Sequence, residues 1–133
     1  MDDNGLVTVR SAVSVRETVD RIVATVSAHG LIVFARIDHG DGAARAGLAL
    51  RPTELVIFGH PRGGTPLMQD SQTAGLDLPI RALAWEDADG AVWLTYERPA
   101  WLAARHGLGA ASAAAVEAIA AGLDMVAKAA TAT

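Results

Sequence analysis

The sequence contains no cysteine, and this absence narrows the chemistry open to the chain. Without thiols there are no disulfides, no cysteine nucleophile and no thiolate metal site, so the fold depends on packing alone. No apolar run approaches the roughly 18 residues that cross a bilayer, which predicts no membrane partner. Basic residues are few and scattered, and the net charge is −4. Nucleic-acid binders concentrate basic residues on one face, so no nucleic-acid partner is expected.

Length and composition favour a single folded domain. A chain of 133 residues fits one domain, predicted over residues 1–133, with a core over about residues 5–128. Apolar residues make up 51% of the chain and charged residues 20%, a balance that excludes general disorder. The start, Met1 to Gly5, is acidic and polar, unlike the basic and then apolar start of a signal peptide. These features predict a soluble, cytoplasmic protein.

The clearest local signal is a helix that starts after Ser14. Ser14 and Glu17 have the spacing of a capping box, in which each side chain bonds a backbone amide near the helix start. The residues that follow place their apolar side chains on one helical stripe, and Gly30 suits a left-handed residue at the helix end. A weakly alternating strand, residues 6–10, precedes this helix.

Four further strands and two helices follow, and the order of the main elements over the whole chain is β-α-β-β-β-β-α, with the shorter of the two helices before the last one. Apolar runs over residues 31–37 and 54–59 indicate two strands, and residues 80–97 form a hairpin. A two-residue turn at Asp89-Gly90 pairs Trp85 with Leu94, which puts Trp85 in the core and Trp93 on the other face. Helices are predicted over Pro99–His106 and Ala110–Ala130. The order predicts an α+β domain, a mainly antiparallel curved sheet with helices packed on one face.

The segment between residues 59 and 79 is long for a structureless loop. Thr65 is the expected N-cap of a helix there, and Pro66 its first residue. The glycines before this start, Gly64 among them, can present free amides to an anion, with Arg62 adding a cation. The alternative is a connecting helix with an ordinary cap and no ligand. The other long connection, residues 38–50, is expected to be a loop with one helical turn.

Histidine and acidic residues at predicted strand ends raise the question of a catalytic or metal site. Asp38-His39 and His60 both follow strands, and Asp77 lies in the long segment. None of them has the helical spacing typical of zinc ligands, so neither a metal nor a cofactor is predicted. Acid–base chemistry by Asp38, His39 and Asp77 remains an alternative, as in a hydrolase or a metal-assisted enzyme.

Several adjoining blocks, in one order along nearly the whole chain, resemble the domain-of-unknown-function 302 family. They are Phe34–His39, Arg51–Leu55, Phe58-Gly59, Gly64–Gln69, Asp77–Pro79, Trp85–Asp87, Val92–Leu94 and Leu102–His106. The resemblance implies a β-α-β4-α domain related in topology to one repeat of the TATA-binding-protein fold, and it implies homodimers. It implies no chemistry, because one fold hosts many functions. His60 stands where asparagine is usual in the family, and Arg62 where lysine is common.

Three functions are therefore weighed. The first is a dimeric module that binds a small, anionic molecule. Its candidate ligand-binding residues are Asp38, His39, Arg62, Gly64, Thr65, Met68 and Asp77. The second is the acid–base or metal-assisted enzyme. The third is a structural or protein-interaction domain without a ligand, in which Trp93 contributes to the dimer interface, because aromatic residues are enriched in interfaces.

Overall fold

The computed structural model describes residues 4–133, so the start of the acidic segment, Met1 to Asp3, lies outside the described residues. The elements, in chain order, are β1 (Leu6–Ser11), α1 (Val15–Ala28), β2 (Ile32–Asp38), α2 (His39–Arg45), β3 (Thr53–Gly59), α3 (Pro61–Asp70), the 3-10 helix η1 (Gln72–Asp77), β4 (Ile80–Glu86), β5 (Val92–Glu97), α4 (Pro99–Arg105) and α5 (Ala113–Thr131).

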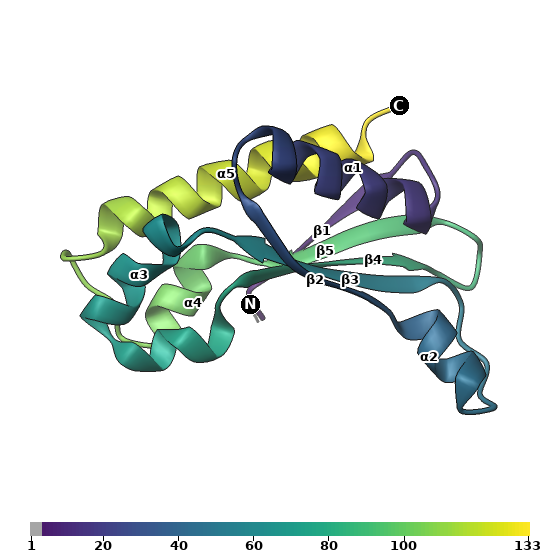
Figure 1. Cartoon of the computed structure of the whole chain (residues 1–133), viewed down its shortest axis with the longest axis horizontal. Helices are drawn as coiled ribbons and strands as arrows, with labels where there is room; N and C mark the ends of the chain where they lie inside the picture. Colours follow the sequence, from purple (N-terminus) through teal and green to yellow (C-terminus); the bar gives the residue numbers. More distant parts are fainter. Residues whose placement is uncertain (1–3) are drawn as a thin grey trace.

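The five strands form one antiparallel sheet in the order β1-β5-β4-β3-β2. Helices α1 and α5 lie side by side over one face of this curved sheet, while α3, η1 and α4 gather at one end and α2 projects from the other (Figure 1). The predicted α+β class, with a mainly antiparallel sheet and helices on one face, is confirmed. The core lies between α1, α5 and the sheet, and its largest side chains include Phe58, Ile22 and Leu94.

Helix α1 forms as its sequence predicts. The Ser14 hydroxyl accepts from the Glu17 N–H at 3.1 Å, and Glu17 itself pairs with Arg21 rather than reaching back. The apolar stripe is fully buried at Val19 and Ile22 among others, so burial on the sheet stabilises the helix. Gly30 has a φ of +73°, the left-handed conformation expected just after the helix.

The β4–β5 hairpin differs from its prediction by one residue of register. Trp85 pairs with Trp93 rather than with Leu94, because the loop is longer than the two residues Asp89-Gly90. The Asp87 carboxylate accepts from the N–H groups of Asp89 and Ala91, both at 2.9 Å, and this holds the wider loop. A shift of one residue turns a strand over. Trp85 therefore lies on the face away from α1 and α5, and its predicted core place is wrong.

Helix α3 begins five residues earlier than predicted. His60 is its N-cap, with Nδ1 accepting from the Arg62 N–H at 3.1 Å, and Pro61 is the first helical residue. Thr65 is consequently inside the helix and caps nothing, and Pro66 is an internal proline. The prediction failed because histidine is an uncommon cap and because Gly63-Gly64 disfavour a helix.

Candidate functional site: a cavity beside α3

An apolar cavity of about 600 Å³ lies where α3 meets the start of β2, the end of β3, the start of β4 and the middle of α5. We call it the α3 cavity. Its apolar walls include Phe34, Phe58, Leu78, Ile80, Ile119 and Leu123. The volume falls in the range of small-molecule sites, which are mostly apolar and carry a few polar groups.

Two local features of the backbone open this space. The β2–β3 register is irregular between Val33 and Ala35, which leaves Phe34 outside the regular pairing and available to line the cavity. On α5, Gly122 contributes no side chain, and a Cβ added there would meet nothing within 4 Å. On α3, a Cβ at Gly64 would approach Leu78 at 3.6 Å. The cavity thus depends on small residues in two helices and on a bulge in the edge strand.

Four polar residues, namely His29, His60, Arg62 and Thr65, line the cavity among these apolar walls. His29 follows α1 and its Nδ1 lies 2.9 Å from the Thr25 carbonyl oxygen, while His60 caps α3. The lining residues include no aspartate and no glutamate. The only formal charge among them is therefore the Arg62 guanidinium.

The backbone amides at the start of α3 are already bonded within the chain. The Arg62 N–H donates to His60 Nδ1, and the N–H groups of Gly63 and Gly64 donate to the His60 carbonyl at 3.0 and 3.1 Å. An anion held by free amides around Thr65, as the sequence suggested, has no support from this geometry. Side chains are the donors that remain for a ligand.

The predicted ligand-binding residues divide into three places. Arg62, Gly64, Thr65 and Met68 line the α3 cavity. Asp38 and His39 lie at the far end of the sheet, since Asp38 pairs with Glu54 whereas the cavity end of β2 pairs with Gly59 (Figure 1). There, Asp38 caps α2 by accepting from the Asp41 N–H at 2.9 Å. The expected loop after β2 is thus a helix of seven residues, none of them buried.

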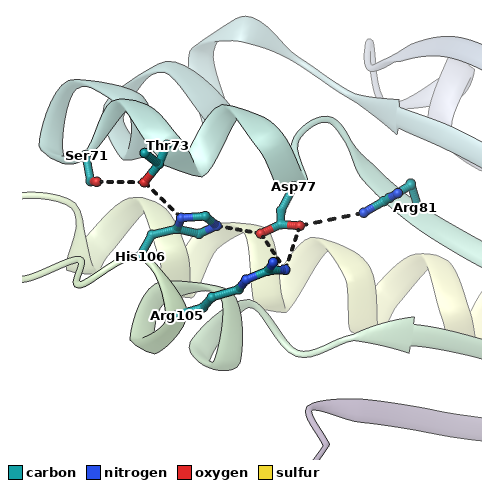
Figure 2. Close-up of polar contacts among 6 residues, drawn as sticks. All are labelled: Ser71, Thr73, Asp77, Arg81, Arg105 and His106. Carbon is teal, nitrogen blue, oxygen red and sulfur yellow. Dashed lines mark hydrogen bonds and ion pairs between the residues drawn. The ribbon is translucent and has the colours of Figure 1, made fainter.

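Asp77, the last of the predicted residues, belongs to a separate polar cluster (Figure 2). We call it the Asp77 cluster; its members are Ser71, Thr73, Asp77, Arg81, Arg105 and His106. Asp77 is 7% exposed and contacts His106 Nε2 at 2.5 Å and Arg105 Nη1 at 3.3 Å. On its other side, His106 Nδ1 lies 3.0 Å from the Thr73 hydroxyl.

The Asp77 cluster joins η1 to the end of α4. Its order of carboxylate, imidazole and hydroxyl resembles a proton relay, but Thr73, Asp77 and His106 are not among the residues that line the α3 cavity. Burial, followed by repulsion from the Asp77 carboxylate, raises the pKa of the nearby Glu97 carboxyl. The sequence placed Arg105 and His106 at the end of a predicted helix and did not reveal their contacts with Asp77. Nothing in their spacing of almost thirty residues could reveal them.

These positions separate Asp38 and His39 from Asp77, so the three residues predicted for an enzyme do not form one site. Within residues 4–133, no group of three or more histidine, aspartate or glutamate side chains is arranged to hold a metal ion. Asp77 has His106, rather than His39, as its imidazole partner.

Trp93, the predicted interface residue, contacts three residues of its own chain. Its ring stacks against Trp85 at 6.4 Å between centroids, Arg10 lies 5.5 Å from its ring centre, and its Nε1–H donates to the Asp87 carboxylate at 2.9 Å. Trp93 is half-buried on the sheet face turned away from α1 and α5.

The family follows from a match over residues 7–127 to the family described as "Domain of unknown function DUF302". The chain belongs to this family, as its sequence blocks predicted. A crystal structure of an "uncharacterized conserved protein DUF302" from Bacillus stearothermophilus superposes with a TM-score of 0.75 over 97% of both chains. At 17% identity, that likeness shows the shared fold.

Curated relatives from Brucella are more similar in sequence. The protein named "Fluoride-specific ion channel FluC 1" of Brucella suis is 59% identical over 126 residues, which are 95% of this chain and 50% of that protein. "Fluoride-specific ion channel FluC 2" of Brucella melitensis is also 59% identical, with 47% of its length covered. The chain therefore spans about half the length of these relatives. Across residues 4–133, no helix combines the length and hydrophobicity that a membrane crossing needs.

Proposed function

We propose that the chain is a binding module for a small, largely apolar molecule, and that the α3 cavity is its site. The observation that carries this proposal is a mostly apolar space of about 600 Å³ lined by residues that include Phe34 and Gly122, the latter without a side chain to fill it. The space is partly open to solvent, so its apolar walls remain in contact with water until a ligand covers them. Removing apolar surface from water is favourable and would drive such binding.

A neutral apolar dye tests the proposal. N-phenyl-1-naphthylamine fluoresces strongly only in apolar surroundings, and we expect saturable binding at one site per chain. Gly122→Leu should abolish that binding, because the new side chain extends from α5 into the cavity, where a Cβ meets nothing within 4 Å. The helix should tolerate leucine well, since glycine is the poorer helix former.

The matched control is Ala121→Leu, which adds a similar side chain at the adjacent, exposed position of α5. It should bind the dye as the unmodified chain does. Equal dye binding by the unmodified chain and Gly122→Leu would remove the cavity from consideration, as would a complete lack of binding by the unmodified chain.

A second candidate function comes from the Brucella relatives. Their names describe ion channels, which must cross a bilayer, whereas residues 4–133 of this chain, which matches about half of such a relative, contain no helix suited to a membrane crossing. We propose that the domain accompanies an ion channel and acts as its ligand-binding accessory. The α3 cavity, at about 600 Å³ and with mostly apolar walls, has the size of a small-molecule site. We expect a molecule that fills it to modulate the channel, rather than the transported ion to bind there.

Fluoride efflux from liposomes tests the accessory role in the Brucella suis relative. We expect the relative without its matching 126-residue segment to conduct fluoride, and the full-length protein to change its efflux when a cavity ligand is added. Loss of conduction in the shortened protein, with its assembly preserved on gel filtration, would argue that the segment is part of the conducting unit.

We also propose a homodimer formed through the sheet face turned away from α1 and α5. On this face Leu6 in one edge strand and Ile32 and Ile37 in the other are each at least 40% exposed, and the half-buried Trp85 and Trp93 lie on strands between them. Aromatic residues are enriched in protein interfaces. Sedimentation velocity at micromolar concentration should find a dimer. Ile37→Arg should give a monomer, whereas Leu48→Arg, on an exposed residue outside the sheet, should leave the dimer intact. A monomeric unmodified chain would contradict the proposal.

A further inference from the structure

The two histidines that line the α3 cavity present opposite hydrogen-bonding groups to it. His29 Nδ1 lies 2.9 Å from the Thr25 carbonyl oxygen, so the proton of the neutral ring is on Nδ1 and Nε2 is an acceptor. His60 Nδ1 instead accepts from the Arg62 N–H, so its ring proton is on Nε2, a donor. His29 follows α1 and His60 begins α3. Acceptor and donor therefore lie on different elements of the cavity wall.

The distribution of charged residues also makes the α3 side of the cavity the more favourable side for an anion. Arg62 lines the cavity, and no ion pair among the described residues uses its guanidinium. No carboxylate lines the cavity, although acidic residues outnumber basic ones in the whole chain and the net charge is −4. A concave apolar wall with one unpaired cation attracts negative charge to that cation.

We infer that the ligand has an apolar body and an anionic head group, and that the head group faces His60 and Arg62 rather than His29. This inference rests on the proposed binding function of the cavity. The head group accepts from His60 Nε2–H and from the Arg62 guanidinium, which forms strong, charge-assisted bonds to carboxylates and phosphates. The lone pair of His29 Nε2 disfavours an anion nearby. The apolar body lies against Phe34, Phe58 and Ile119.

The test compares two probes that differ only in the head group. Decanoate and 1-decanol are each used to displace N-phenyl-1-naphthylamine from the chain, below their aggregation limits. We expect decanoate to bind about tenfold or more tightly than 1-decanol, the size typical of hydrogen bonds to charged groups. Arg62→Gln should remove most of that preference, because it should weaken decanoate binding far more than 1-decanol binding.

Two further variants locate the head group. His60→Asn retains an N-cap for α3 but loses the ring Nε2–H, so it should also reduce the preference for decanoate. His29→Ala should leave the preference intact. Equal displacement by the two probes, or an unchanged preference in Arg62→Gln, would overturn the inference while the dye still reports a working cavity. No dye binding at all would instead reject the proposed function on which the inference rests.

Discussion

The two ends of the sheet start from similar local sequence and reach opposite outcomes. At one end a strand closes on Asp38-His39 and leads into α2, an exposed helix with no buried residue. At the other end a strand closes on Gly59-His60 and leads into α3, which packs against η1 and α5. Each helix is capped by a side chain just after its strand. Only the second encloses a cavity.

What differs is the number of elements that meet at each end. Helix α2 contacts mainly β3, whereas α3, η1, α4 and α5 converge at the cavity end (Figure 1). Convergence lets one end bury Asp77 with its partners and also shape the α3 cavity, while Asp38 at the other end stays exposed. A polar residue after a strand therefore becomes part of a site only where other elements cover it.

The largest effect should come from Asp77→Ala. Removing the carboxylate leaves His106 buried without its partner, and breaking a buried pair typically costs about 3–5 kcal/mol. We expect the free energy of unfolding to fall by about 3 kcal/mol. The lower end of the range applies because Arg105, the other partner, is half-exposed and can turn to solvent. Urea denaturation measures this. If the loss of stability were no larger than the loss caused by substituting an exposed acidic residue, the Asp77 cluster would not hold η1 to α4.

Asp38→Ala is the corresponding change at the other end of the sheet. It removes the cap that accepts from the Asp41 N–H, and loss of a cap costs about 1 kcal/mol. Urea denaturation should give this smaller value, and hydrogen exchange should locate the loosening in α2. An effect as large as that of Asp77→Ala would erase the distinction between the two ends.

Two glycine-to-alanine substitutions, one in α2 and one in α5, test whether a change in helix propensity affects ligand binding only at the cavity. Gly42→Ala in α2 and Gly122→Ala in α5 each add a Cβ that meets nothing within 4 Å. Each should raise the free energy of unfolding by roughly 0.5–1 kcal/mol, because alanine is the better helix former. Only Gly122→Ala should weaken dye binding, since Gly122 lines the α3 cavity and Gly42 does not. Weakened binding in both variants would point to an indirect effect on the fold.

The smallest expected effect is on the stability of the fold in acid, and it involves one aspartate at each end of the sheet. Hydrogen bonds from the Gly109 N–H and the Ser112 hydroxyl hold the pKa of Asp70 below its ordinary 3.8, and the Trp93 indole N–H does the same most strongly for the pKa of Asp87. A depressed pKa in the folded state stabilises the fold above the ordinary value, and this contribution is lost as the pH falls through the folded value.

The melting temperature measured between neutral pH and the region below 3.8 checks this prediction. Asp70→Asn at the cavity end and Asp87→Asn in the hairpin loop should each make the fall of the melting temperature in acid less steep. An unchanged acid slope in both variants would show that these hydrogen bonds do not discriminate between the protonated and charged carboxyls.

Local patterns predicted the elements well where one signal dominated. The cap at Ser14, the apolar stripe and Gly30 define α1, and the family blocks agree with the five-stranded antiparallel sheet. The predicted register of the hairpin was wrong by one residue because the Asp87 carboxylate bonds backbone amides and widens the loop. The dipeptide Asp89-Gly90 does not reveal these hydrogen bonds. The predicted start of α3 was wrong for a similar reason, since the N-cap is His60 and not Thr65.

The sequence predicted only part of the candidate site. Arg62, Gly64, Thr65 and Met68 came from one unusual segment, and all four line the cavity. Most of the remaining wall comes from β2, β3, β4 and α5, and neither Phe34 nor Gly122 differs locally from an ordinary strand or helix residue. Asp77 was noticed for its charge, but its partner His106 was not, because the two meet only through the packing of η1 on α4.

Hydrophobic spacing, caps and turn residues therefore specify which segments of this chain are helices and strands, because those signals act between near neighbours. Where each polar side chain ends up is a different matter. Asp38 ends a strand and Asp77 ends a 3-10 helix, and although both are aspartates, one is exposed while the other is buried and paired. Burial depends on segments far apart in the chain packing together, and it was this packing that made one end of the sheet an exposed cap and the other a cavity.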